Sequence, residues 1–356
     1  MKKIISFPHM GDYYIPIKFL LTKVTDYEIM TPLPITKRTI ELGSKHSPEF
    51  VCVPFKYNLG NYIESLEKGA NILVQAGGGC RYGYYAEVQE QILKDLGYEF
   101  EFYCLVDKDQ YVPINAYKVL KKINSKLSIF KYVYYMLLTI LMINYMDKTD
   151  IFIRSNIGFE INKGSFEKYL KEMYCEFSEV KGFIDLYKKY RKYKKIFKGI
   201  EVNKSPTCLK VGIIGELYTL MEPFSNYFLE KTLADMGIEI NRYTNVTYLL
   251  ITKRYNQKRV LKECGKYCKY TIGADGTDNI AVANVLISKK YDGLIHTKPF
   301  GCTPEIGAMS ILQNISKEYN MPIIYFSFDS QTSEAGIKTR LEAFYDMIKM
   351  RRKKDD

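Results

Sequence analysis

Short apolar runs alternate with amphipathic stretches near both ends of the chain. Runs of this length predict buried strands, and the amphipathic stretches between them predict helices. Before residue 107 the predicted strands are 2–8, 26–32, 70–77 and 99–106. Strands that alternate with helices in this way form parallel sheets covered by helices. Residues 1–106 therefore predict an α/β domain.

The same rhythm returns after residue 208. The predicted strands there are 209–216, 238–243, 292–300 and 322–329. The predicted helices are 223–236, 279–290, 304–319 and 335–352. A second parallel α/β domain is therefore expected over residues 209–356.

The segment 107–208 has a different pattern, because it is amphipathic, rich in lysine and tyrosine, and has few strand signals. It predicts a helical insertion. Its longest apolar run, 133–146, is short for a membrane span and predicts a buried helix. The expected fold class is α/β, with two Rossmann-like parallel-sheet domains and a helical insertion between them. No membrane association is expected, and the N-terminus does not resemble a signal peptide, which favours a cytoplasmic protein.

Charge changes this picture little. The formal net charge is +12, and basic residues concentrate in 187–199 and 350–356. A basic balance invites a nucleic-acid partner. Both segments, however, have the pattern of solvated helical surface, so nucleic-acid binding is the less favoured interpretation.

Cysteines are the first candidates for chemistry. The chain has eight, and a cytoplasmic protein would not use them as a disulfide scaffold. Cys80 and Cys302 each follow a predicted strand, and Cys52 precedes a predicted helix. Ligands bind beyond the carboxyl ends of strands in open α/β sheets. Cys80 and Cys302, in different domains, are thus expected at a cleft where they could face one another.

The residues around Cys80 favour an anionic ligand. Gly77, Gly78 and Gly79 precede it and Arg81 follows it. Glycines allow backbone N–H groups to approach an anion, and a thiolate-bound iron–sulfur cluster is anionic. Arg81 would offset its charge. The spacing alone does not settle the matter, because three unrelated buried cysteines remain an alternative.

Acid–base and anion-binding candidates are weaker. His9 and Glu305 lie at predicted strand ends, where either could transfer protons, although a satisfied loop histidine and a helix cap are the alternatives. The loop 273–279 has a pattern that can bind an anion at a helix start or form an ordinary turn.

Several motifs together resemble the 2-hydroxyacyl-CoA dehydratase superfamily. They are most similar to the branch of acyl-CoA dehydratase activase-related and double-cubane iron–sulfur proteins. The motifs cover most of the chain outside the helical insertion and are 7–14, 30–61, 75–85, 213–226, 299–305 and 326–344.

The resemblance implies a cysteine-ligated 4Fe-4S cluster, or a double cubane, between two Rossmann-like domains. The ligands carried over are Cys52, Cys80 and Cys302. The resemblance further implies that an ATP-dependent iron–sulfur activase supplies low-potential electrons. It also implies a dimer or a paired related subunit, an acyl-CoA or small-molecule substrate, and a reductive or dehydrating reaction.

One departure bears on these expectations. The segment 329–334 reads DSQTSE, where the family pattern has Asp-Glu-Gln-Thr-Gly-Glu.

A double cubane needs further ligands, for which Cys104, Cys264 and Cys268 are candidates without a matching motif. A non-catalytic accessory subunit, which binds an activase or dehydratase partner through the basic insertion, therefore stays an alternative.

Overall fold

The computed structural model describes residues 2–78, 80–105, 112–253 and 257–355. The chain divides into two compact units, residues 1–142 and residues 143–356, which we call the N-terminal unit and the C-terminal unit. Within the described residues each unit contains one four-stranded parallel sheet. The predicted α/β class with two parallel sheets is therefore confirmed.

The sheet of the N-terminal unit has the strand order β2-β1-β3-β4. Its strands are β1 (Ile4–Ser6), β2 (Glu28–Ile29), β3 (Ile72–Gln75) and β4 (Glu101–Cys104). Its helices are α1 (Tyr14–Val24), α2 (Lys37–His46), α3 (Val53–Glu67), the 3₁₀ helix η1 (Arg81–Tyr84), α4 (Tyr85–Asp95), α5 (Val112–Ile123) and the first part of α6 (Ile129–Arg154).

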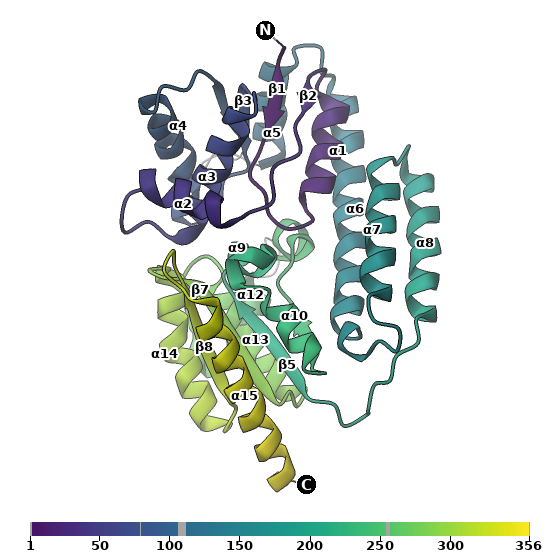
Figure 1. Ribbon diagram of the computed structural model, residues 1–356, viewed down its shortest axis with the longest axis vertical. Coiled ribbons are helices and arrows are strands. Elements are labelled where there is room, and N and C mark those ends of the chain that lie inside the picture. The colour runs from purple at the N-terminus through teal and green to yellow at the C-terminus, as the bar shows by residue number, and fades with distance from the viewer. Residues whose placement is uncertain (1, 79, 106–111, 254–256, 356) are drawn as a thin grey trace. The chain divides into compact units, whose positions relative to one another are not determined.

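Helices cover both faces of this sheet (Figure 1). Successive side chains of a strand point to opposite faces. In β3, Ile72 and Val74 therefore pack with α1 and α5, whereas Leu73 packs with α3 and α4. The N-terminal unit has three layers, and β3 is buried at its centre.

The sheet of the C-terminal unit has the order β6-β5-β7-β8, which repeats the topology of the first sheet. Its strands are β5 (Lys210–Gly215), β6 (Glu239–Arg242), β7 (Gly293–Pro299) and β8 (Ile323–Phe328). The helices of this unit include α7 (Ser165–Ser178), α8 (Phe183–Gly199), α9 (Leu217–Met221), α10 (Leu229–Asp235), α12 (Gln257–Cys264), α13 (Gly276–Ser288), α14 (Thr303–Glu318) and α15 (Glu334–Asp355).

Strand β7 shows how this second sheet is covered (Figure 1). Leu294 packs in the core with residues of α12, α13 and α14. A side chain at Gly293 would collide with Phe344 of α15, so α15 lies against the opposite face. His296 and Lys298 follow Leu294 at intervals of two and therefore point toward the α13 and α14 side.

The predicted helical segment is observed as α5 to α8, with α7 and α8 side by side (Figure 1). The boundary between the two units falls inside α6, after Met142. The helices that follow β4 are therefore shared by both units. The domain limits 106 and 208 stay a prediction.

Helix α6 is partly exposed, although it was predicted to be buried. Leu138, Met142 and Met146 are buried, whereas Val133 and Leu137 are exposed. The helical stretch 129–159 is long and apolar enough to cross a membrane by length and composition, and a third of its most apolar window is buried. A core helix meets the same criteria, so this feature does not by itself indicate a membrane protein.

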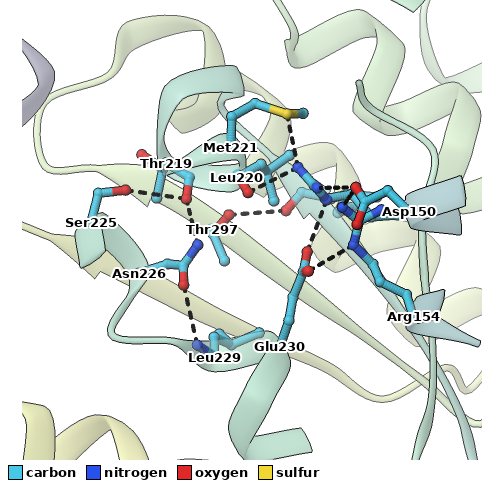
Figure 2. A network of polar contacts seen from close by, with 12 residues as sticks. Asp150, Arg154, Thr219, Leu220, Met221, Ser225, Asn226, Leu229, Glu230 and Thr297 are labelled. Carbon is cyan, nitrogen blue, oxygen red and sulfur yellow. Dashed lines mark hydrogen bonds and ion pairs between the residues drawn. The ribbon is translucent and has the colours of Figure 1, made fainter. Parts of the chain in front are cut away.

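Within the C-terminal unit, two buried arginines join the last turns of α6 to β6 and α10 (Figure 2). Arg154 Nε lies 2.7 Å from Glu230 Oε2, and Arg242 Nε lies 2.8 Å from Glu230 Oε1. Asp150 accepts from the other side, 3.3 Å from Arg242. Burial would raise the pKa of Glu230, but the two arginines outweigh it and lower that pKa. The carboxylate therefore stays charged and holds α6, β6 and α10 together.

One predicted helix, 223–236, is wrong. The chain forms α9, then a 3₁₀ turn over Pro223–Asn226, and only then α10. Tyr227 and Phe228 have φ of 56° and 53°, a left-handed conformation that no continuous right-handed helix contains. The Tyr227 hydroxyl donates to the carbonyl of Thr332 at 2.5 Å, and this tertiary contact stabilises the break.

Candidate functional site

Each sheet has a point where the chain switches direction across the sheet, between β1 and β3 and between β5 and β7. Ligands of open α/β sheets bind outside the carboxyl ends of strands at such points. Strand β3 leads to Cys80, and β7 leads to Cys302. Both strands hold the third place in sequence and the same place in their sheets. Cys80 and Cys302 thus occupy equivalent positions in the two units.

All three predicted ligand cysteines are helix N-caps. Cys52 caps α3, Cys80 caps η1, and Cys302 caps α14. A proline stands two residues after Cys52 and again two residues after Cys302. The N-terminus of a helix carries a partial positive charge, which favours a thiolate over a thiol. The three side chains therefore share an environment suited to anionic sulfur.

In the N-terminal unit, Tyr85 contacts Cys52 and lies within electrostatic reach of Cys80. Its hydroxyl lies 2.6 Å from Cys52 Sγ, where either atom can be the donor. Burial raises the pKa of Tyr85, and the negative charges of Cys52 and Cys80 raise it further. Both cysteines thus raise the pKa of the same hydroxyl. The backbone N–H of Tyr82 donates to Cys80 Sγ at 3.4 Å.

The predicted residues around Cys80 have different surroundings. Gly78 is needed for a close approach, because a Cβ there would lie 3.0 Å from the Tyr82 ring. Gly79 lies outside the described residues. Arg81 is exposed, and its positive charge partly opposes the rise of the Tyr85 pKa. Arg81 is thus placed to offset negative charge on this side of the site.

His9 follows β1, at the same switch point as Cys80. Its backbone N–H donates to Asn61 Oδ1 at 2.9 Å. Its half-buried ring stacks on Tyr14 with centroids 5.7 Å apart. The backbone and ring contacts hold His9 at the carboxyl edge of the sheet.

In the C-terminal unit, Glu305 sits in a fully buried polar network. Its carboxylate lies 2.7 Å from His296 Nε2 and accepts two hydrogen bonds from Asn279 Nδ2, both 2.9 Å long. Asn279 Oδ1 in turn accepts from the N–H of Gly215 at the end of β5. The network ties the first turn of α14 to β5, β7 and α13. It fixes the helix start that Cys302 caps.

Lys298 is a charged residue of this region that the sequence patterns did not single out. It is 5% exposed on β7 and points toward the side of α14. Burial lowers its pKa, while the negative charges of Cys302 and Glu305 act in the opposite direction. In the sequence, the only indication of a role for Lys298 was its position two residues after His296, in the predicted strand that precedes Cys302.

The loop 273–279 is filled by charges of the chain itself. Lys253 Nζ lies 2.6 Å from Asp275 Oδ1 and 3.2 Å from Asp278 Oδ2. Asp275 also accepts from the N–H of Leu217. Burial raises the pKa of Glu216 to about 7, and the Asp275 charge adds to the effect of burial. This carboxylate-rich turn does not favour a bound anion.

Two of the possible extra cluster ligands belong to the core. Cys264 and Cys268 are buried, and their thiols donate to the carbonyls of Thr277 and Tyr270. Burial raises the pKa of Cys264 to about 12. A neutral, hydrogen-bonded core thiol is a poor metal ligand. Cys104 ends β4 and is half-buried.

The fit to a metal group can be tested on the donors themselves. Within the described residues, no group of three or more His, Cys, Asp or Glu side chains converges on one point. Cys52 and Cys80 belong to the N-terminal unit and Cys302 to the C-terminal unit. The type of donor and its helix-start environment fit a thiolate-bound cluster, while neither unit supplies a complete set of ligands by itself.

A comparison with protein-family models finds a match for part of the C-terminal unit. Residues 253–348 match the family of the 2-hydroxyglutaryl-CoA dehydratase D-component. The matched segment contains Cys302, Glu305 and Lys298. No curated protein matches the chain. The match supports the resemblance to the 2-hydroxyacyl-CoA dehydratase superfamily that the sequence motifs indicated, and with it a component of the 2-hydroxyacyl-CoA dehydratase type.

Proposed function

We propose that the chain is an iron–sulfur component of the 2-hydroxyacyl-CoA dehydratase type, in which Cys52, Cys80 and Cys302 hold the cluster. The observation that carries the proposal is that each of these cysteines caps a helix, two of them at equivalent switch points. A helix start therefore recurs at all three cysteines. Cys264 also precedes a short 3₁₀ helix, Gly265–Tyr267, but its thiol is buried and donates to the carbonyl of Thr277.

Bound there, the cluster would accept single electrons at low potential and offer an iron not held by protein to substrate or water. The chain's own residues would hold and tune it. Tyr85 lies within hydrogen-bond distance of Cys52, and Arg81 brings a positive charge to the same region. These contacts would orient the thiolates and offset their charge.

The two acid–base candidates receive different roles. His9 is half-buried at the carboxyl edge of its sheet, where it can exchange a proton with a ligand. Glu305 is fully buried, and both its oxygens are engaged by Asn279 and His296. We assign proton transfer to His9 and a positioning role to Glu305.

Three cysteines favour a 4Fe-4S cluster with one open iron over a double cubane, because the buried Cys264 and Cys268 are poor additional ligands. The remaining parts of the proposal rest on the superfamily. Electrons would come from an ATP-dependent activase, and the chain would act as a dimer or beside a related subunit. The substrate would be an acyl-CoA or another small molecule, and the reaction, in the cytoplasm, reductive or dehydrating.

The test is the iron and acid-labile sulfide content of the full chain after anaerobic purification, with an EPR spectrum of the reduced protein. About four of each per chain would support one 4Fe-4S cluster, and about eight or nine would support a double cubane. A folded protein that contains no iron and resists reconstitution would overturn the proposal and leave the accessory role.

A second candidate function is that of an accessory subunit, and one surface favours it. An open groove along α8 is lined by cations and by Tyr187 and Tyr190. The cations are Lys188, Arg191, Lys192, Lys194, Lys195 and Lys198. Apart from Lys192, none of them has an ion pair among the described residues. Such a face suits an acidic protein partner.

The accessory role predicts that a purified activase binds equally well to the cluster-free chain, with an affinity that falls steeply with salt. The charge reversals Arg191→Glu and Lys195→Glu should abolish that binding. Lys168→Glu on α7 is the matched control. Activase binding that requires the cluster, or whose affinity is the same in the parent and in the two charge-reversal variants, would count against this role.

A further inference from the structure

The end of β7 contains a positive charge that no contact within the described residues neutralises. Lys298 is 5% exposed. No hydrogen bond or ion pair of its ammonium group is found in the described part of the chain; the ring of Phe300 has its centroid 6.0 Å from Nζ. Placing a lysine in an almost fully buried position without an anionic partner is costly, so its retention favours a ligand.

The direction of the side chain is set by the strand. Leu294, His296 and Lys298 share one face of β7. His296 reaches Glu305 in the first turn of α14, at 2.7 Å. Lys298 therefore extends on the same side, one step further toward Cys302. The electrostatic effect of Cys302 on the Lys298 pKa agrees with this placement.

The nearest carboxylate does not serve as the partner of Lys298. Glu305 is fully buried, and its two oxygens already contact Asn279 Nδ2 and His296 Nε2. Glu305 is thus held inside the polar network with Asn279 and His296 and, among the described residues, makes no hydrogen bond or ion pair with Lys298 at the carboxyl end of β7. The ammonium group remains available to an anion at the start of α14.

Two independent features thus favour negative charge at one place. The first is the N-terminus of the 16-residue helix α14, where Cys302 is the N-cap. The second is the largely buried Lys298, whose ammonium group has no ion pair among the described residues. Gly301, with φ of +76°, makes the tight turn that brings the end of β7 to this helix start.

We propose that Lys298 is the charge-compensating residue for the anionic group bound at Cys302. The inference rests on the proposed function, because that group is then the thiolate-bound cluster. A positive charge beside a cluster stabilises the state with one more electron, so Lys298 would raise the reduction potential. Lys298 would be a positioning and tuning residue, since the ligand bond belongs to Cys302.

The test compares the reduction potential of the reconstituted full chain with that of variants, by redox titration followed by EPR. Lys298→Met removes the charge and keeps the length, and Lys298→Arg keeps the charge. Lys317→Met removes a lysine from the last turn of the same helix and is the matched control. Lys298→Gln is a second neutral variant should methionine prevent folding.

We expect Lys298→Met to bind iron but to have a more negative potential. The reduced-to-oxidised ratio at a fixed potential should fall by about tenfold, which corresponds to about 59 mV for a one-electron couple. Lys298→Arg and Lys317→Met should keep the parent potential. A cluster whose potential is the same in the parent and in Lys298→Met would overturn this inference alone. A parent protein without iron would overturn the proposed function and this inference with it.

Discussion

The hydroxyl of Tyr85 lies 2.6 Å from Cys52 Sγ, across the starts of α4 and α3. The tyrosine is 7% exposed, so its hydroxyl has little access to water and depends on this partner. The contact joins two helix starts in one unit. Cys80, five residues before the start of α4, acts electrostatically on the same hydroxyl.

The first prediction concerns this contact. Tyr85→Phe keeps the ring and removes the hydroxyl, so the free energy of unfolding of the cluster-free chain should fall by about 1 kcal/mol. Urea denaturation measures the change. Tyr84→Phe is the control, because Tyr84 is 56% exposed, and should change stability by less than about 0.5 kcal/mol. Equal effects of the two variants would refute a specific role for the contact.

The second prediction separates ligands from other thiols. Cys52→Ser, Cys80→Ser and Cys302→Ser should each lose most of the iron, because a serine hydroxyl does not replace a thiolate. Cys175→Ser on α7 is the control for an exposed cysteine and should keep all of it. Iron analysis after anaerobic reconstitution gives the answer. A Cys80→Ser protein with the full iron content would remove Cys80 from the ligand set.

The third prediction concerns the buried ion network of Figure 2. Glu230→Gln leaves the buried Arg154 and Arg242 with Asp150 as their remaining carboxylate. The free energy of unfolding should fall by about 3 kcal/mol, the low end of the cost of breaking a buried pair.

The control for this variant is a surface pair of similar distance. Glu90→Gln removes the half-exposed partner of the exposed Lys94, at 2.6 Å, and should cost no more than about 0.5 kcal/mol. Chemical denaturation of both variants measures the difference. If Glu230→Gln cost as little as Glu90→Gln, the network would not be what joins α6 to β6 and α10.

The fourth prediction is a pH dependence of stability. Burial raises the pKa of Glu216 from 4.5 to about 7 in the folded chain. The folded state therefore binds this proton more tightly than the unfolded state. The contribution is fully present below the unfolded pKa and is lost as the pH rises through about 7, a loss of the order of 3 kcal/mol.

Glu216→Gln tests this because it keeps the size of the side chain and removes the titration. Between about pH 5 and pH 8, the variant should lose less stability than the parent does, by most of that amount. Denaturation curves across this range measure it. Parallel stability profiles of the two proteins would show that Glu216 does not titrate in this window.

Much of the scaffold could be predicted from local pattern. The buried strands 292–300 and 322–329 were expected within one or two residues of β7 and β8, because continuous apolar runs flanked by turns leave few alternatives. The positions of Cys80 and Cys302 after third strands followed from the same alternation. The break at Tyr227 could not be expected, since it depends on a tertiary hydrogen bond to Thr332.

Glu305 was a candidate from the sequence, but the contacts among the polar groups around Cys302 escaped prediction for a related reason. Asn279, His296 and Glu305 lie far apart in the sequence or on different elements, and only the packing of α13 and α14 on β7 brings them together. A lysine in an apolar strand gives no periodic signal of its own. Lys298 acquires meaning from the face of β7 on which it lies.

The repeated sheet topology has a consequence for how such a protein can evolve. Cys80 and Cys302 stand at matching places in two sheets of the same strand order. In a homodimer built from one sheet, a mutation beside one cysteine would appear beside both. A single chain with two copies escapes this constraint, so an exposed Arg81 accompanies one thiol and a buried Lys298 the other. Selection can therefore adjust the surroundings of the two cysteines separately.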